Sequence, residues 1–194
     1  MPVGHREALL AAARKLLREK GFARTTARDL VAASNTNLAS IGYHYGSKEK
    51  LLYAAMEAEF AEWIEHVGGL AVRAEGVSPV ERLAFAWATV RDTFPAHRAL
   101  LVAYLEAAAQ AERSAEVRAQ LARHLAAARR RIGELVLAAM PTQVTREQAD
   151  ALASFFIAVC DGLAMQWLFD PDAVPPGAGL TNVLVDRVTA PLDR

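Results

Sequence analysis

The stretch from Thr25 to Lys48 reads TTARDLVAASNTNLASIGYHYGSK, and its pattern decides the fold. Thr26 is followed three residues later by Asp29, a spacing at which the hydroxyl and the carboxylate can each satisfy a free backbone N–H at a helix start. The pattern therefore predicts a short helix from Ala27 to about Ser34. A second short helix, from about Leu38 to Tyr45, follows after a tight turn.

The turn between these helices is Asn35-Thr36-Asn37. Asn35 stands where the first helix must end with a positive φ, which asparagine tolerates better than most residues. Asn37 is placed to cap the second helix. In that helix the spacing predicts a buried stripe at the i, i+3 and i+7 positions, namely Leu38, Ile41 and Tyr45. The residues predicted to point away from this stripe are Ala39, Ser40, Gly42, Tyr43 and His44.

The outward face of the second helix consists mainly of small side chains and ends in a tyrosine and a histidine. Small residues are a poor choice for a solvated face, but they suit close approach to a large flat surface. Gly42 is the most unusual of them, because glycine inside a helix costs about 1 kcal/mol relative to alanine. Two explanations stay open. Either Gly42 relieves crowding beside Tyr43 and Tyr45, or it lets the backbone approach a partner.

The segment from His5 to Ala54 resembles the N-terminal DNA-binding domain of the TetR family of bacterial transcriptional regulators. The resemblance rests on GF at 21–22, TT at 25–26, YHY at 43–45 and SKEKLL at 47–52, all at family spacing. It implies that the second short helix lies in a DNA major groove. Two positions depart from the family pattern. Asn35 replaces the usual glycine, and Gly42 replaces a common aromatic residue that often touches bases.

We expect this head to bind double-stranded DNA. The predicted contacts to base edges come from the second helix and its cap, with Asn37 and Ser40 as hydrogen-bonding residues and Leu38 or Ala39 against a thymine methyl group. Tyr43 is expected to reach both base edges and phosphates. The other predicted phosphate contacts are Thr26, His44 and Lys48, the last of which lies beside a helix N-terminus that favours anions.

The charge distribution supports this division of the chain. The formal net charge of the 194 residues is zero, with 22 basic and 22 acidic side chains. Residues 1–50 carry nine Lys and Arg against four Asp and Glu, which gives +5, so the remaining 144 residues carry 13 against 18, which gives −5. A basic head on an acidic body is typical of a DNA-binding module joined to a second functional part.

Other classes of protein find little support in the sequence. A single cysteine, Cys160, excludes an intrachain disulfide and favours a reducing compartment. No apolar run reaches 18 residues, so we predict a soluble cytoplasmic protein without a membrane partner. The histidines show no ligand spacing, so neither a metal nor a cofactor is expected. The usual catalytic motifs are absent too, which argues against an enzyme.

The composition, rich in Ala and Leu, predicts an all-α fold. We place a three-helix head at residues 1–50 and a larger helical domain for ligand binding and dimerisation at residues 51–194. The first helix of the head spans residues 5–20. A helix from Lys48 to Val67, ended by Gly68 and Gly69, is the predicted lever between the two parts. The helices expected after it span 79–94, 95–111, 115–140, 146–169 and 180–189, with Pro95 separating the first two.

The body carries two further predicted sites. A ligand cavity among the middle helices is expected mainly because the family resemblance implies one, and because bundle interiors are common ligand sites. The candidates to line it are the large apolar residues Met56, Phe60, Trp63, Phe85, Trp87 and Tyr104. Core packing alone explains the same residues. The helix of residues 148–169 has an apolar arc too wide for one neighbour, so it is either a central core helix or a dimer contact. We favour a homodimer, which the resemblance also implies, through Phe155, Val159, Leu163 and Trp167.

Together these features predict a homodimeric DNA-binding regulator. We expect it to repress transcription from a pseudo-palindromic operator and to be released by a small apolar or amphipathic effector. An all-helical enzyme and a ligand-independent DNA binder are the alternatives.

Overall fold

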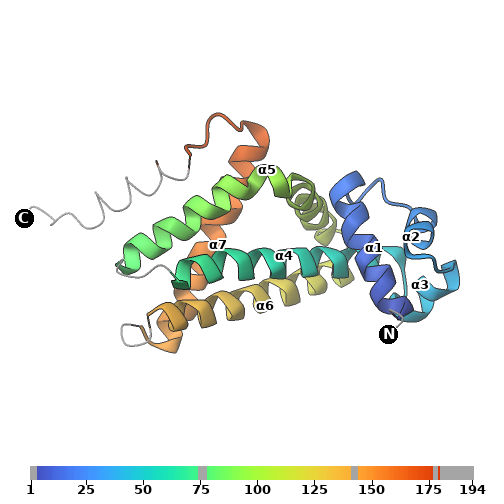
Figure 1. Ribbon diagram of the computed structural model, residues 1–194, viewed down its shortest axis with the longest axis horizontal. Helices are drawn as coiled ribbons and strands as arrows, with labels where there is room; N and C mark the ends of the chain where they lie inside the picture. The colour runs from blue at the N-terminus through green and yellow to red at the C-terminus, as the bar shows by residue number, and fades with distance from the viewer. Residues whose placement is uncertain (1–3, 74–77, 141–143, 177–178, 180–194) are drawn as a thin grey trace, which may run out of the picture. The chain divides into compact units, whose positions relative to one another are not determined.

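The computed structural model describes residues 4–73, 78–140, 144–176 and 179. Within these residues the chain forms seven helices and no strand (Figure 1). The helices are α1 (His5–Lys20), α2 (Ala27–Ser34), α3 (Leu38–Tyr45), α4 (Lys48–Arg73), α5 (Pro79–Ala111), α6 (Ala115–Ala139) and α7 (Arg146–Phe169). The expected all-α fold is confirmed. The predicted last helix, 180–189, lies outside the described residues.

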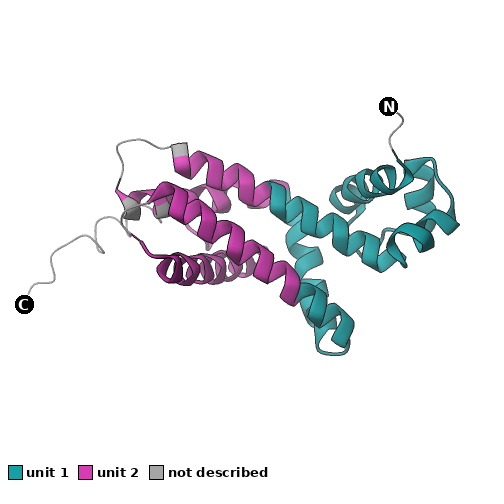
Figure 2. Ribbon diagram, turned by 90° about the horizontal axis from the view of Figure 1, so that it is seen from below, with its two compact units in different colours: residues 1–62, 97–121 teal, residues 63–96, 122–194 magenta. Residues whose placement is uncertain are grey.

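The chain divides into two compact units, coloured separately in Figure 2. Unit 1 comprises residues 1–62 and 97–121, and it therefore holds α1, α2, α3 and the first part of α4. Unit 2 comprises residues 63–96 and 122–194, and it holds the end of α4, the first part of α5, most of α6 and the whole of α7. Three helices thus run from one unit into the other.

The head helices have the predicted bounds and caps. Thr26 Oγ1 accepts a hydrogen bond from Asp29 N (3.1 Å), and Asp29 Oδ2 accepts one from Thr26 N (2.9 Å), so the capping box is formed. Asn35 adopts the left-handed conformation, with φ 51° and ψ 43°. Asn37 caps α3 by accepting a hydrogen bond from Ser40 N through its side-chain oxygen (3.0 Å).

The predicted end of the lever helix at Gly68 and Gly69 is wrong, because α4 continues to Arg73. Packing explains the glycine at position 68. A Cβ atom there would lie 2.3 Å from Leu135 Cδ1 on α6, far inside contact distance. Gly68 therefore allows α4 and α6 to approach closely within unit 2, and it does not end the helix.

The predicted break at Pro95 is also wrong, because α5 is one helix of 33 residues with the proline inside it. Proline lacks an N–H and removes one backbone hydrogen bond at a cost of about 3 kcal/mol, so packing around this position has to offset that cost. Phe94, which precedes it, is completely buried, and its ring lies 5.7 Å from that of Trp167 on α7. The division between the two units falls one residue after Pro95.

Helix α7 begins as predicted. Thr145 and Gln148 form a capping box, in which Thr145 Oγ1 accepts from Gln148 N (3.2 Å) and Gln148 Oε1 accepts from Thr145 N (2.8 Å). One face of α7 is buried in unit 2, and it consists of Ala149, Ala153, Ala164 and Trp167. Phe155, Met165 and Phe169 are exposed. By length and composition alone, α7 is also apolar enough to cross a membrane, with a mean hydropathy of 1.6, which is weak evidence for a span.

Candidate DNA-binding surface

The head is held together by a small apolar core to which α1, α2, α3 and the start of α4 contribute. Its completely buried side chains are Leu9, Leu17, Leu30, Leu51 and Leu52. Phe22, in the turn after α1, contacts Tyr53 with ring centroids 5.0 Å apart. Thr25 Oγ1 donates to the Gly21 carbonyl (2.7 Å), which closes the turn that leads into α2. These contacts give α3 a rigid support.

The face of α3 that projects from this core carries the residues expected to meet DNA. Leu38 is 58% exposed and Tyr43 is 87% exposed. Ala39 and Gly42 are exposed between them. An apolar side chain and a tyrosine this open to water have no role in the core of the head. They are suited to contact with a partner.

Two predicted orientations on α3 are wrong. Leu38 was expected in the buried stripe, but α3 begins at this residue and its side chain lies outside the core. Ser40 was expected to point outward but is only 8% exposed, and its hydroxyl donates to Asn37 Oδ1 (3.2 Å). The buried residues of α3 are therefore Ser40 and Ile41. Of the predicted stripe, only Ile41 is fully buried.

The residues predicted to contact phosphates differ in their exposure and in the hydrogen bonds that they already make within the head. Thr26 is exposed, and its hydroxyl serves as the α2 cap. His44 is half-buried, and its ring stands edge-on to Tyr43 with centroids 4.8 Å apart. Lys48 Nζ donates to the Thr25 carbonyl (3.2 Å) and lies 3.4 Å from Glu49. The lysine therefore ties the start of α4 to the segment before α2, while its side chain remains 27% exposed.

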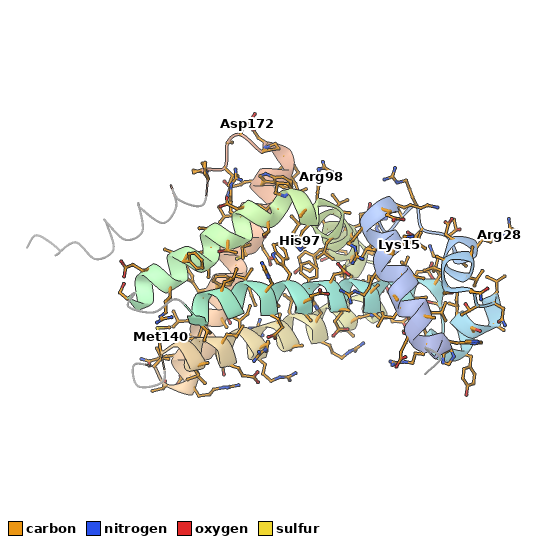
Figure 3. The ribbon with its side chains drawn as sticks, viewed as in Figure 1. Lys15, Arg28, His97, Arg98, Met140 and Asp172 are labelled. Carbon is orange, nitrogen blue, oxygen red and sulfur yellow. The ribbon has the colours of Figure 1, made fainter. Side chains whose placement is uncertain are left out.

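Charged contacts hold the helices of the head in place. Lys20 on α1 donates to Asp29 on α2 (2.7 Å), and this bond, together with those from Thr26, holds the pKa of the Asp29 carboxyl well below its usual range. Tyr45 donates to the Arg6 carbonyl (2.9 Å), and burial raises the pKa of its phenol. Arg28 on α2 is exposed, and its side chain projects away from the head (Figure 3).

One cluster was missed by the sequence analysis. The carboxylate of Glu59 on α4 is 9% exposed and accepts hydrogen bonds from Arg14 and Arg18 of α1, and Arg14 also donates to Glu62. The signal was present in the spacing. The two arginines are four residues apart and the two glutamates three apart, so each pair shares one face of its helix. The cluster attaches α1 to the part of α4 that lies in unit 1.

Two family models match the chain. The model described as bacterial regulatory proteins, tetR family, matches residues 9–55, and the model described as BetI-type transcriptional repressor, C-terminal, matches residues 79–189. The first covers α3 and its supporting core, and the second covers more than half of the chain. The chain belongs to the TetR family. It is therefore a transcriptional regulator with a helix-turn-helix DNA-binding head, and members of this family are DNA-binding regulators rather than enzymes.

Solved structures share the fold of this TetR-family chain at low sequence identity. GusR from Salmonella enterica is 22% identical with a TM-score of 0.63, and the match covers 97% of each chain. A TetR-like transcriptional regulator from Rhodococcus sp. RHA1 is 21% identical with a TM-score of 0.59, covering 99% of this chain and 100% of the other. The fatty acid degradation regulator FadR from Bacillus halodurans is 13% identical with a TM-score of 0.65, covering 97% and 98%. No curated protein sequence matches.

The six residues expected to line an effector cavity fall into both units of the TetR-family fold. Met56, Phe60 and Tyr104 belong to unit 1, where the rings of Phe60 and Tyr104 lie 5.6 Å apart. Trp63, Phe85 and Trp87 belong to unit 2. There Trp63 Nε1 donates to Thr93 Oγ1 (2.9 Å). Phe85 is 43% exposed.

Trp87 is a buried residue whose indole N–H lacks a hydrogen-bond partner among the described residues. It is 4% exposed and lies against Phe155 and Phe156 of α7, with ring centroids 5.9 and 6.0 Å away.

The four residues expected at a dimer contact differ in exposure. Phe155 is 56% exposed, Val159 and Leu163 are half-buried, and Trp167 is buried within unit 2. Neighbouring groups partly desolvate the Asp161 carboxyl and raise its pKa to about 6. Burial likewise raises the pKa of the Cys160 thiol, so this cysteine is a poor nucleophile. Among the residues that the structure describes, no group of His, Cys, Asp and Glu could hold a metal ion.

Proposed function

We propose that this TetR-family chain is a homodimeric transcriptional repressor that binds a pseudo-palindromic operator and leaves it when a small apolar or amphipathic effector binds. The exposed face of α3, with Leu38 and Tyr43 open to solvent on a firmly capped helix, is the observation that carries the proposal. The match of residues 79–189 to a repressor model supports repression over activation. Cytoplasmic location follows from a role on chromosomal DNA.

Each protomer places α3 in a major groove. Leu38, Ala39 and Tyr43 contact base edges, and Asn37 keeps its amide NH₂ for a base or phosphate, since its oxygen is used by the cap. Ser40 supports that cap from inside. Thr26, His44 and Lys48 contact phosphates, together with the α4 N-terminus. A two-fold axis then sets half-sites about one helical turn apart, or slightly more.

The exposed apolar face of α7 is the proposed dimer contact. Phe155, Met165 and Phe169 lie on the side of α7 opposite its buried alanines and Trp167. A face of this kind is stabilised when a second copy removes it from water, because burial of apolar area contributes about 25 cal/mol per Å². Phe155 is among the residues that contribute, while Trp167 holds α7 to its own unit.

Effector binding in the body acts on DNA binding through α4. This helix carries Glu59, the partner of Arg14 and Arg18, and continues into unit 2 as far as Arg73. An effector that displaces α4 would change the separation of the two heads. To move the population from 1:99 to 99:1, it must favour the non-binding state by about 5.5 kcal/mol. A ligand-bound structure with unchanged head separation would contradict this mechanism.

Selection of bound sequences from a random duplex pool, with purified protein at near-physiological salt, tests the proposal. A recovered palindrome establishes a dimeric, specific regulator. Weak binding without a motif that disappears as the salt concentration rises would favour a nonspecific DNA binder. Placing the selected duplex between a promoter and a reporter gene then tests repression, since a repressor lowers expression and an activator raises it.

A further inference from the structure

Gly42 lies inside α3 although the fold of the head does not require glycine there. The residue is helical, and the described glycines with positive φ are Gly21 and Gly46. A Cβ atom built on Gly42 meets no heavy atom within 4 Å outside its own helix backbone and its two chain neighbours. Neither backbone conformation nor a close neighbour within the chain therefore accounts for this residue.

The absence of crowding decides between the two explanations that the sequence left open. Tyr45 does not approach the Cβ position of Gly42. Tyr43 follows directly in the chain, and consecutive helical side chains point about 100° apart, so it does not compete for the same space. Relief of crowding is thus excluded, and approach by a partner is the explanation that remains.

Glycine is also a costly residue at this place. It is the least favourable residue in a helix interior after proline, and α3 has only eight residues. Asn37 and Gly46 hold the two ends of α3 by hydrogen bonds, and these caps allow so short a helix to contain a glycine. Within the described residues, no contact at Gly42 offsets this cost.

The position of Gly42 identifies where the partner approaches. Residues three and four apart share a helix face, so Gly42 lies on the same face as Ala39 and Leu38, one turn further along. Leu38 is 58% exposed, and Ala39 and Gly42 are exposed as well. These are the residues assigned to base edges under the proposed function, on which this inference rests. The backbone of α3 is thus uncovered at the centre of the surface that faces DNA.

We propose that Gly42 is a specificity-determining residue, at which the bare backbone of α3 comes into van der Waals contact with base edges of the operator. The missing side chain lets the helix lie deeper in the major groove than any other residue would allow. Contact of this kind depends on the shape of the base pairs, so it discriminates between sequences. The phosphate contacts of the head do not depend on it.

The test compares full-length wild-type protein with Gly42→Ala and Gly42→Leu on the selected operator and on an unrelated duplex, at one salt concentration. We expect Gly42→Ala to weaken operator binding about tenfold or more and Gly42→Leu to weaken it further, because one good base contact is worth about one to two orders of magnitude in discrimination. Binding to the unrelated duplex should change less than about twofold, since phosphate contacts dominate it. The melting temperature of Gly42→Ala should equal or exceed that of the wild type.

Gly4→Ala is the matched control, because a Cβ atom there also meets nothing within 4 Å and the residue precedes α1, outside the exposed face of α3. It should leave operator affinity unchanged. The inference is overturned if Gly42→Ala binds the operator as tightly as the wild type, if it loses affinity equally on both duplexes, or if its melting temperature falls. If the wild type selects no operator, the proposed function fails as well, whereas equal binding by Gly42→Ala to a selected operator refutes only the role of Gly42.

Discussion

At the scale of single residues, Asn35 shows what local backbone chemistry makes predictable. A helix that ends in a tight turn needs a residue that accepts positive φ, and the choice of amino acids that do so is small. The prediction followed from the residue type and its place, without knowledge of the rest of the fold. The structure confirms it with a φ of 51°.

Substitution of Asn35 tests this backbone argument directly. Asn35→Gly should leave the free energy of unfolding unchanged or raise it slightly, because glycine adopts the left-handed region without steric cost. Asn35→Ala should lower it by about 1 kcal/mol, since alanine has the same Cβ as asparagine but lacks the short polar side chain that can hydrogen-bond locally in the left-handed conformation. Denaturant titration of the two variants measures the difference. Equal stabilities would show that the left-handed conformation does not persist in solution.

Lys48 is a second residue whose role can be tested by substitution, because it can bind phosphate without reading the base sequence. Its ammonium group bonds to the Thr25 carbonyl, yet the side chain keeps 27% of its exposure and can still meet a phosphate. Lys48→Ala should weaken binding to all duplexes alike and reduce the slope of log affinity against log salt by about 1, as expected for the loss of one phosphate contact. Titrations at several salt concentrations on operator and unrelated duplexes give both quantities. A changed sequence preference would show that Lys48 reads bases.

At the scale of elements, the short helices were predictable, whereas the continuity of two long ones, α4 and α5, was not. The bounds of α2 and α3 depend on caps within a few residues of sequence, and the caps at Thr26, Asn35 and Asn37 all formed. The continuity of α4 and α5 depends on neighbours distant in the chain. Gly68 is helical because Leu135 packs against it, and Pro95 is helical beside the buried Phe94. Rules based on the local sequence therefore predicted helix ends at Gly68 and Pro95, whereas packing against distant residues keeps both positions helical.

Gly68→Ala tests whether packing holds the second half of α4. The methyl group would improve helix propensity, but it would lie 2.3 Å from Leu135 Cδ1 and force α6 or its side chain to move. We expect a net loss of about 1–3 kcal/mol in the free energy of unfolding, the usual cost of overpacking. Gly42→Ala is the comparison, since the same change in open space should stabilise. Should Gly68→Ala prove the more stable, α4 and α6 would not be in close contact.

At the scale of the whole molecule, the separation of a DNA-binding head from the rest of the chain was predictable from the distribution of charge. The position of an effector site was not. A head of +5 and a body of −5 are properties of composition, which needs no structure. A cavity depends on which apolar residues fail to fill the space between helices. The six residues proposed for it lie in two different units, where several already contact other aromatic rings. Hydrophobic spacing cannot distinguish a lining residue from a core residue, because both patterns are the same.

The exposed face of α7 makes the assembly itself testable. Met165→Glu combined with Phe169→Glu places two charges on this face while leaving buried Ala153, Ala164 and Trp167 untouched. We expect the double variant to remain folded, because side chains that are 45% and 77% exposed contribute little to the core, but to sediment as a monomer. Its operator affinity should fall by about two orders of magnitude, the range over which avidity from two linked sites acts. Binding to a single half-site should be unchanged.

A charge-changing surface variant in unit 1 controls for the general effect of added negative charge on the protein. Lys15 is 64% exposed on α1, so Lys15→Glu changes the net charge without touching α7 and should remain a dimer. If the α7 variant also stays dimeric, the apolar face of α7 is not the contact between protomers. A test of membrane binding would then follow, because the length and apolarity that suit a helix pair also suit a lipid surface. If wild-type protein floats with lipid vesicles and the α7 variant does not, the apolar face of α7 binds a membrane.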